Sequence, residues 1–492
     1  MGRIQPDSAT VECRRPAQES LAGLVRNAGW LTGGRLITDL TSLLLFIVIS
    51  RNYGIAGIGQ YAYGFAVAGL AASFMSLGIE DYAIRELSRL SSSNDKLHLM
   101  RTLFGTQVYA VLLSCLLLPP YLILTDATHE VVMIITVLCI YTFCLTTSRT
   151  LLAPAISNQA MKGPSIAELL CNAPPAIFSI ALMQSLHVDM AIALIPVSLG
   201  MMFLLAYGFV SARRHLGVVY PVASMRDAIS IISRTWPFAA SVVVFYLSSR
   251  LSLVIVSLLG GDTVAGLFAT GLKILDVGSR PLNFIGVASY PTLSRCFDYD
   301  KPGFTHAAER LLKLSFLAGF ALTFAMIFIV PAILPLVFGE EFIPAIPVVQ
   351  ATAVIAIFVA IDLTAYRLLF AMHLQNRRVM IHVAGVLLAA VASIGLIPTI
   401  GVYGAILATF LSYAFMSFMY GRIIAGGSST RILLVSFRNY GAAMLASSAG
   451  GATVYWSMQR LDAAAAAVLI LFSITMIALR RVTPTKVGHE PS

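Results

Sequence analysis

The sequence predicts an all-α polytopic membrane protein with about 14 transmembrane helices, and three observations support this prediction. Of the 492 residues, 58% are hydrophobic and only 11% are charged, whereas a soluble domain carries roughly 25% charged residues. The mean hydropathy is +0.85. Apolar runs long enough to cross a bilayer as a helix recur along the whole chain. Because a backbone in lipid must form its own hydrogen bonds, these runs predict a helical bundle.

The lengths of the apolar runs set the expected spans. Their limits are 26–50, 59–84, 99–124, 130–152, 165–186, 189–211, 236–259, 264–290, 311–338, 344–371, 379–399, 401–424, 433–456 and 463–480. Residues 1–25 are polar and rich in arginine, and we expect them to form a cytoplasmic tail. The apolar run that follows is too long for a signal peptide, which predicts a permanent first span.

Basic residues alternate from loop to loop, and this alternation sets the orientation. Lys and Arg gather in both tails and after the second, sixth, eighth, tenth and twelfth spans, whereas loops such as 125–130, 260–263 and 339–342 are neutral or acidic. Since basic loops stay in the cytoplasm, both termini are expected there. Only Arg51 and Arg460 break the alternation. Topology and anionic lipid explain the formal net charge of +10, so no nucleic acid partner is expected.

An internal repeat predicts two lobes. At an offset of 207 residues, residues 40–64 match residues 247–271 at eight positions, which include Gly54/Gly261 and Gly59/Gly266. Six spans separate the two copies, so the copies have the same orientation, as in parallel repeats about an axis along the membrane normal. The expected parts are an N-lobe of six spans (26–211), a cytoplasmic amphipathic linker (212–235), a C-lobe of six spans (236–424), and two extra spans with a cytoplasmic tail (425–492).

The sequence lacks the motifs of several enzyme classes. It contains no G-x-x-x-x-G-K-[ST] loop, no metalloprotease or nucleophile-elbow motif, and no Cys/His cluster with zinc-site spacing. All loops between the expected spans are short, so no separate soluble domain is expected. We therefore expect a transporter rather than an enzyme, with no cofactor.

Three segments resemble the motifs of one family. Residues 49–89, 258–295 and 337–350 follow, in this order, the patterns of the polysaccharide biosynthesis flippases. The first segment matches its pattern at Arg51, Tyr53, Gly54, Gly59, Tyr61, Gly78 and Arg85. Ile55 stands where the family usually has a proline. The chain thus resembles a flippase of the multidrug, oligosaccharidyl-lipid and polysaccharide exporters over nearly its whole length.

This resemblance implies both a fold and a function. Members of the family have two lobes around a central cavity that opens alternately to either side of the membrane. The implied function is translocation of a polyprenyl-pyrophosphate-linked oligosaccharide across the inner membrane, for O-antigen, capsule or exopolysaccharide export. The implied partners are this lipid-linked oligosaccharide, membrane lipid, and a polysaccharide polymerase and glycosyltransferases that act on the same polysaccharide.

Two alternative functions are weighed against this one. A multidrug or cation antiporter of the same superfamily usually has twelve spans and an acid-led cation site, so the extra pair of spans and the cations within the membrane disfavour it. A membrane-embedded polysaccharide polymerase or ligase typically needs a large external loop, and no expected external loop exceeds about ten residues.

Of the charged residues within the expected spans, eight are candidates for function, because a charge in mid-span costs at least ~2.5–3.5 kcal/mol on insertion scales. The predicted substrate-binding cations are Arg35, Arg250, Lys273 and Arg280, and the acids are Asp39, Asp276, Glu168 and Asp362. Arginine binds phosphate oxygens bidentately, so the cations suit a pyrophosphate headgroup. The acids could hold these cations between substrates, or take up protons or sodium and so couple transport to a gradient. His373 and His382 are expected to be interfacial or packing residues.

Local ion pairing is the alternative interpretation of these charges. Arg35 and Asp39 are four residues apart, as are Asp276 and Arg280, a spacing at which opposite charges on a helix can neutralise each other. Lys273 has no obvious local partner, which favours a role in binding. The repeat counterpart of Arg250 is Leu43, so the fold does not demand a charge at that position.

Overall fold

The computed structural model describes residues 21–424 except 159, 187 and 223. Over these residues the chain is helical and contains no strand, which confirms the predicted all-α fold class. The helices are α1 (Leu21–Ser76), α2 (Ile79–Arg89), α3 (Ser93–Leu124), α4 (His129–Ser157), α5 (Lys162–Leu186), α6 (Met190–Leu216), α7 (Met225–Tyr299), α8 (Lys301–Phe324), η1 (Ala325–Ile329), α9 (Val330–Phe338), η2 (Glu340–Ala345), α10 (Ile346–Thr352), α11 (Ile355–Ala371), α12 (Gln375–Ile400) and α13 (Val402–Ile424). The expected spans 433–456 and 463–480 lie outside the described residues.

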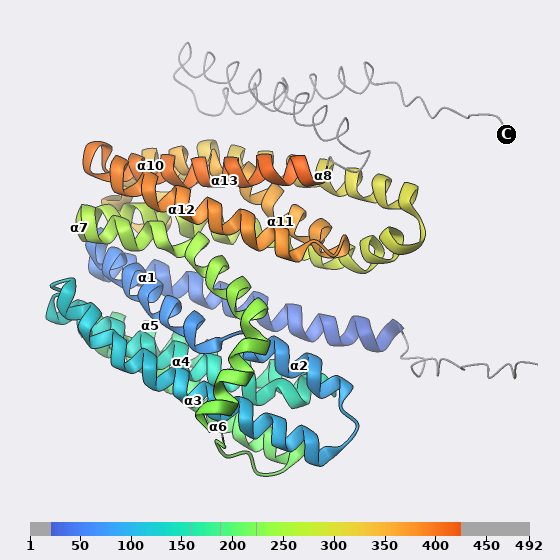
Figure 1. The fold of residues 1–492 in the computed structure, drawn as a ribbon. Helices are drawn as coiled ribbons and strands as arrows, with labels where there is room; N and C mark the ends of the chain where they lie inside the picture. Colours follow the sequence, from blue (N-terminus) through green and yellow to red (C-terminus); the bar gives the residue numbers. More distant parts are fainter. Residues whose placement is uncertain (1–20, 159, 187, 223, 425–492) are drawn as a thin grey trace, which may run out of the picture.

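The two longest helices, α1 and α7, each turn back at a glycine and form a helical hairpin (Figure 1). Gly54 has φ 66° and Gly261 has φ 78°, a left-handed conformation that glycine adopts without steric cost. The rings of Phe46 and Tyr61 lie 6.4 Å apart, whereas a straight helix would separate residues 46 and 61 by about 22 Å. We call residues 21–53 and 55–76 the first and second arms of α1, and residues 225–260 and 262–299 those of α7.

Each of the twelve spans expected up to residue 424 coincides with a helical segment. In the described part of the chain, nine helices are long and apolar enough to cross a membrane, or ten when the bent pair Glu340–Thr352 and Ile355–Ala371 counts as one span. Two of the nine, Leu36–Arg89 and Phe238–Asn283, have 54 and 46 residues and contain the glycine turns. A straight helix of 54 residues would be about 80 Å long, far more than a hydrocarbon core of about 30 Å. The chain is a multi-pass membrane protein.

Large apolar side chains are common on the outer faces of these helices. Such a surface would be unfavourable in a soluble protein. Leu116, Leu117, Ile123 and Leu124 on α3 are all exposed. Between the helices, large apolar side chains such as Ile58 and Phe268 are fully buried. An apolar outer face suits a lipid environment, because lipid tails are as apolar as these side chains.

The expected linker 212–235 is not a separate amphipathic helix. Helix α6 continues to Leu216, and α7 already begins at Met225, so only residues 217–224 connect them. Ser224 caps α7: its hydroxyl accepts a hydrogen bond from the Asp227 amide, while the Asp227 carboxylate accepts from the Ser224 amide and hydroxyl. These bonds hold the pKa of Asp227 below its ordinary value. The reciprocal cap starts the helix early, so residues 225–235 are continuous with the helix of the seventh expected span.

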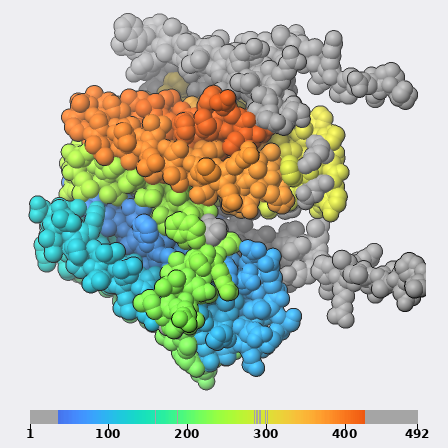
Figure 2. Space-filling view, viewed as in Figure 1, coloured from blue at the N-terminus to red at the C-terminus, as the bar shows by residue number. Residues whose placement is uncertain are grey.

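Two groups of helices lie side by side (Figure 1). Helices α1 to α6 make one group, which we call the N-lobe, and the second arm of α7 with α8 to α13 makes the other, which we call the C-lobe. The first arm of α7 joins them: Phe238 packs on Gly78 of the N-lobe, while Ser248 contacts His382 of α12. The surfaces of the two lobes meet along α1 and α7 (Figure 2).

The turns of the two hairpins interlock. A Cβ atom built on Gly59 would lie 1.9 Å from the Asp262 carbonyl oxygen, and one built on Gly266 would lie 1.9 Å from the Ile55 carbonyl oxygen. Gly59 and Gly266 are 207 residues apart, as are Ile55 and Asp262. Two turns that are related by a two-fold axis make the same contact in both directions. The predicted parallel repeat therefore requires such a reciprocal contact. From the alternation of basic loops we expect this contact on the outer side of the membrane.

We expect Gly59→Ala and Gly266→Ala each to destabilise the protein, because the added methyl group must displace a backbone carbonyl. The expected cost is roughly 1–3 kcal/mol, seen as a lower Tm of the detergent-solubilised protein. Gly395, near the C-terminal end of α12, has open space around it, so Gly395→Ala is the matched control and should leave Tm unchanged or raise it. Equal stability of all three variants would contradict the interlocked turns.

Candidate functional site

Charged side chains from three helical arms gather where the lobes meet. They are Asp39 on the first arm of α1, Arg250 on the first arm of α7, and Lys273, Asp276 and Arg280 on its second arm. Counted along each helix, these residues lie about 16–28 Å from the glycine turns, a distance within the thickness of a hydrocarbon core of about 30 Å. We call these five residues the charge cluster.

The carboxylates of the cluster bind cations on other arms. Arg280 Nη2 lies 3.4 Å from Asp39 Oδ1, and Arg250 Nη2 lies 3.1 Å from Asp276 Oδ2. The local pairing of Asp276 with Arg280 is therefore wrong, and Asp39 forms an ion pair across the lobes. The side chain of Arg35 lies outside the described residues. A pair at i,i+4 contributes only about 0.2–0.5 kcal/mol, so the approach of a second helix easily redirects the partners.

Lys273 has a neutral partner. Its Nζ lies 3.0 Å from the Ser42 hydroxyl oxygen and 5.4 Å from the centre of the Phe46 ring, both on the first arm of α1. Among the described residues it forms no ion pair: its contacts are a hydroxyl dipole and an aromatic face, and the Asp276 and Asp39 carboxylates act on it at longer range. The charge of Lys273 is therefore the one most available to an anionic ligand.

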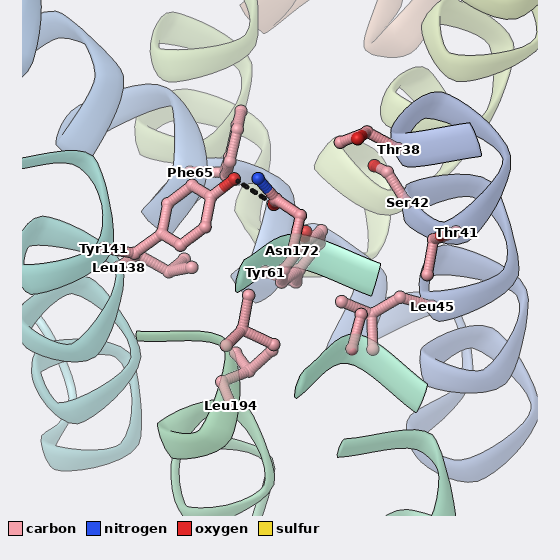
Figure 3. A pocket seen from close by; sticks show the side chains of 12 residues that line it. Thr38, Thr41, Ser42, Leu45, Tyr61, Phe65, Leu138, Tyr141, Asn172 and Leu194 are labelled. Atoms are coloured by element: carbon pink, nitrogen blue, oxygen red, sulfur yellow. Dashed lines mark hydrogen bonds between the residues drawn. The ribbon is translucent and has the colours of Figure 1, made fainter. Parts of the chain in front are cut away.

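A small polar cavity opens beside Ser42, inside the N-lobe (Figure 3). Threonines, tyrosines and an amide supply its polar lining, and Tyr141 Oη donates to Asn172 Oδ1 over 3.3 Å. No charged residue lines it. The cavity has a volume of about 70 Å³, enough for two water molecules at about 30 Å³ each but too small for a sugar ring. The cavity can therefore hold water next to the charge cluster, but it cannot bind a glycan.

The two remaining predicted acids are not in the charge cluster. Glu168 on α5 pairs with Arg149 on α4, with 3.0 Å between Oε1 and Nη2, so this pair stays within the N-lobe. Asp362 on α11 is buried in the C-lobe, where its Oδ1 lies 3.1 Å from Nε2 of His382 on α12. His382 was expected to be an interfacial or packing residue, and its partnership with Asp362 was missed. The two residues lie at similar distances from the turn between α11 and α12, a signal that could have found the pair.

Arg51, an exception to the alternation of basic loops, contacts the end of another helix. Its Nε donates to the Val337 carbonyl over 2.8 Å, and its Nη2 donates to the Leu336 carbonyl. These carbonyls belong to the last turn of α9, the negative end of the helix dipole. Nearby on the same side, Gln60 donates to Asp262 over 3.0 Å. Both contacts join the N-lobe to the C-lobe at the outer end.

Comparison with known proteins identifies the family. The family described as polysaccharide biosynthesis protein matches residues 24–297, more than half of the chain. The chain belongs to this family. The expectation from the three sequence motifs is thereby confirmed, and the match includes every residue of the charge cluster. A comparison with curated protein sequences found no match.

Solved structures of similar fold are membrane transporters. A lipid II flippase, MurJ, in an inward closed conformation is 13% identical, with a TM-score of 0.67 over 92% of this chain and 99% of that one. A multidrug resistance MATE family transporter of the MOP superfamily, in an inward-facing conformation, is 13% identical, with a TM-score of 0.55 over 80% and 96%. The eukaryotic MATE transporter AtDTX14 is 12% identical, with a TM-score of 0.55 over 85% and 100%. At these identities the likeness establishes the fold.

A double-mutant cycle should show that Arg250 and Asp276 interact. Arg250→Met alone leaves a carboxylate without its partner, so it should destabilise the protein more than Arg250→Met combined with Asp276→Asn. Because both side chains are partly exposed, we expect a coupling energy of about 1 kcal/mol, measured by thermal unfolding in detergent. The exposed i,i+4 pair Glu309–Lys313 on α8 is the control and should couple by less than about 0.5 kcal/mol. Additive effects of the two cluster substitutions would contradict the pair.

Proposed function

We propose that this protein is a flippase that moves a polyprenyl-pyrophosphate-linked oligosaccharide across the bacterial inner membrane by alternating access. The product would feed a surface polysaccharide such as O-antigen, capsule or exopolysaccharide. One observation carries the proposal: three cations from the two arms of α7 meet between the lobes at mid-membrane depth. They are Arg250, Lys273 and Arg280. Family membership supports the same function.

The cluster suits a pyrophosphate because binding can exchange one anion for another. Arg250 and Arg280 are already paired with carboxylates, so their charges are offset before the substrate arrives. Phosphate oxygens can replace these carboxylates as bidentate partners of the guanidinium groups. No cation is left bare at any stage, which avoids the cost of an uncompensated charge in the membrane. Lys273, which forms no ion pair among the described residues, adds the net positive charge that favours the anionic headgroup.

Headgroup binding would also loosen the contacts between the lobes. The Asp39–Arg280 pair and the Ser42–Lys273 hydrogen bond both link the N-lobe to the C-lobe. A ligand shifts a conformational equilibrium only when it binds the two states with different affinity. A pyrophosphate that competes for Arg280 and Lys273 would bind the two states with different affinity, because its binding breaks the contacts that hold the lobes in their present arrangement.

The outer side supplies the opposing contacts. The interlocked turns, Arg51 on the end of α9 and Gln60 on Asp262 close the lobes together there. All of them are polar or glycine contacts, which can be broken without exposing a large apolar surface. Alternating access would open this side once the contacts at the charge cluster have rearranged. Both termini are proposed to lie in the cytoplasm, as the alternation of basic loops indicates.

Loss of a cluster arginine should slow flipping strongly while the protein still inserts. We expect Arg250→Ala and Arg280→Ala each to lower the rate about 10- to 100-fold, the value of a charge-assisted hydrogen bond. The readout is surface polysaccharide in a strain that lacks the wild-type gene, with membrane insertion checked by blotting. Arg377→Ala is the control, since Arg377 is an exposed residue at the start of α12. Full activity of both cluster variants would refute the assignment.

Ligand charge separates this function from a drug antiporter. The purified protein should bind undecaprenyl pyrophosphate, and inorganic pyrophosphate at high concentration should compete, because the cluster recognises phosphate oxygens. An organic cation such as tetraphenylphosphonium should not compete, since it would meet three cations. Preferential binding of the organic cation, measured in the same competition assay, would favour the multidrug alternative instead.

A further inference from the structure

We propose that a pocket at one end of the N-lobe binds an uncharged sugar ring of the transported glycan, and that its occupancy favours separation of the lobes at that end. The pocket lies between the glycine turn of α1 and the first turns of α4 and α6, and we call it the outer pocket (Figure 1). Its volume is about 370 Å³, within the range of about 300–1,000 Å³ that is usual for ligand sites. The role of the pocket rests on the flippase function, whereas sugar binding itself does not.

The lining of the outer pocket combines polar groups with an apolar floor. Ile134, Met190 and Ala191 are buried and form the floor. Two carboxylates, an imidazole, an amide and a phenol ring surround it, from Glu130, Asp189, His129, Gln60 and Tyr53. A sugar ring carries hydroxyl groups around its edge and C–H groups on its faces, so it needs both kinds of lining.

Contacts between α1 and α6 hold the pocket in shape. The Tyr53 hydroxyl donates to the Val188 carbonyl over 2.6 Å. A Cβ atom built on Gly57 would lie 3.2 Å from the terminal methyl carbon of Met190, so the start of α6 packs closely on the turn of α1. A pocket that is already formed costs less conformational entropy when a ligand binds.

The two carboxylates of the outer pocket have no need of a cation. Glu130 lies in the first turn of α4, and Asp189 is the N-cap residue of α6. The positive end of each helix dipole therefore offsets one of the two charges. Among the described residues neither carboxylate forms an ion pair, so their oxygens are open to other donors. Hydroxyl groups suit them, because hydrogen bonds from O–H to a carboxylate are short and strong.

The charge of the pocket selects the class of ligand. Among the described residues no lysine or arginine lines it, so a phosphate or an acidic sugar would meet only like charges, which are costly. The described residues also contain no group of three His, Cys, Asp or Glu side chains that could hold a metal ion, and Ca²⁺ needs six to eight oxygen ligands. The ligand we infer is a neutral hexose or N-acetylhexosamine.

The two ends of the proposed substrate would thus meet opposite charges. The charge cluster supplies cations about 16–28 Å from the glycine turns, whereas acids gather at the turns themselves. Asp262 of the C-lobe lies there, and Glu341 Oε2 is 3.0 Å from a Cβ atom built on Gly54. Phosphates are therefore favoured at the cluster and disfavoured at the turns, where a neutral glycan is accepted.

Gln60 connects the outer pocket to the interface between the lobes. Its amide lines the pocket and also donates from Nε2 to Asp262 Oδ2 of the C-lobe over 3.0 Å. A sugar hydroxyl that accepts a hydrogen bond from Gln60 competes with Asp262 for the same donor. The sugar therefore binds better when the lobes are apart at this end, and a ligand favours the state that it binds better.

Saturation-transfer NMR, on the full chain in lipid nanodiscs, tests the ligand class directly. We expect glucose or N-acetylglucosamine to bind at least about tenfold more tightly than glucuronate, because the two carboxylates repel a third. Glu130→Gln combined with Asp189→Asn should bring this ratio to within about twofold of one, since it removes the charges and keeps acceptor oxygens. A merely structural role of the two acids would not change the ratio.

Two further variants complete the binding test. Ala56→Phe should abolish sugar binding, because Ala56 is an exposed lining residue and the larger side chain fills the pocket. Asp126→Asn is the matched control and should bind as wild type, since Asp126 is an exposed acid outside the lining whose φ of 46° suits asparagine. Absence of neutral sugar binding, or preferential binding of Ca²⁺ or an organic cation, would overturn the proposal.

The competition for Gln60 has its own measurement in the same assay. Asp262→Ala frees the amide, so sugar affinity should rise about 2- to 10-fold, the worth of one hydrogen bond. Glu341→Ala removes another acid from the same end of the C-lobe without freeing Gln60, and should leave the affinity unchanged. Equal affinities of the wild type and Asp262→Ala would refute the link between the pocket and the lobes.

The source of the sugar separates the role of the pocket from the proposed function. Ala56→Phe should weaken binding of a neutral oligosaccharide linked to undecaprenyl pyrophosphate and lower surface polysaccharide about fivefold, but leave binding of undecaprenyl pyrophosphate itself unchanged. If Ala56→Phe affects only soluble sugar, the ligand is a free sugar and the role in transport is refuted. Binding of soluble sugar by a wild-type protein that flips no lipid would refute the proposed function alone.

Discussion

A charge inside a membrane needs a partner, and in this protein the partners lie on different helices. Asp39 binds Arg280, Asp276 binds Arg250, Glu168 binds Arg149 and Asp362 binds His382. Because an unpaired charge in the membrane is costly, each pair fixes two segments relative to each other. In the function we propose, the pairs between the lobes are exchanged for pairs with an anionic substrate, so the same constraint would serve transport.

The glycine turns give these pairs their geometry. Gly54 and Gly261 reverse the two longest helices, so that charges more than twenty residues apart, such as Arg250 and Asp276, come within 3.1 Å. The close approach of the Gly59 and Gly266 segments then holds the turns together at the outer end. The charge cluster and the interlocked turns therefore lie at different depths of one interface, as a transporter that opens alternately on either side requires.

Sequence reasoning predicted which residues carry charge into the membrane, but not all of their partners. Helical spacing suggested that Asp276 binds Arg280, whereas the second arm of α7 turns Asp276 to Arg250 and leaves Arg280 to Asp39. It also counted Arg51 as an exception, although Arg51 has a role as a donor to the end of α9. Both errors have the same cause: spacing describes contacts within a helix, and these contacts are between helices.

The sequence alone determined the all-α membrane fold, the approximate places of the helical segments and the family, because hydropathy, length and local motifs are properties of contiguous residues. Only the tertiary structure decided that α1 and α7 turn at Gly54 and Gly261, that 225–235 are continuous with the helix that follows, that Lys273 meets Ser42, and that His382 joins Asp362 to Ser248. These contacts depend on how helices pack against each other, and packing brings together residues whose separation along the chain carries no signal.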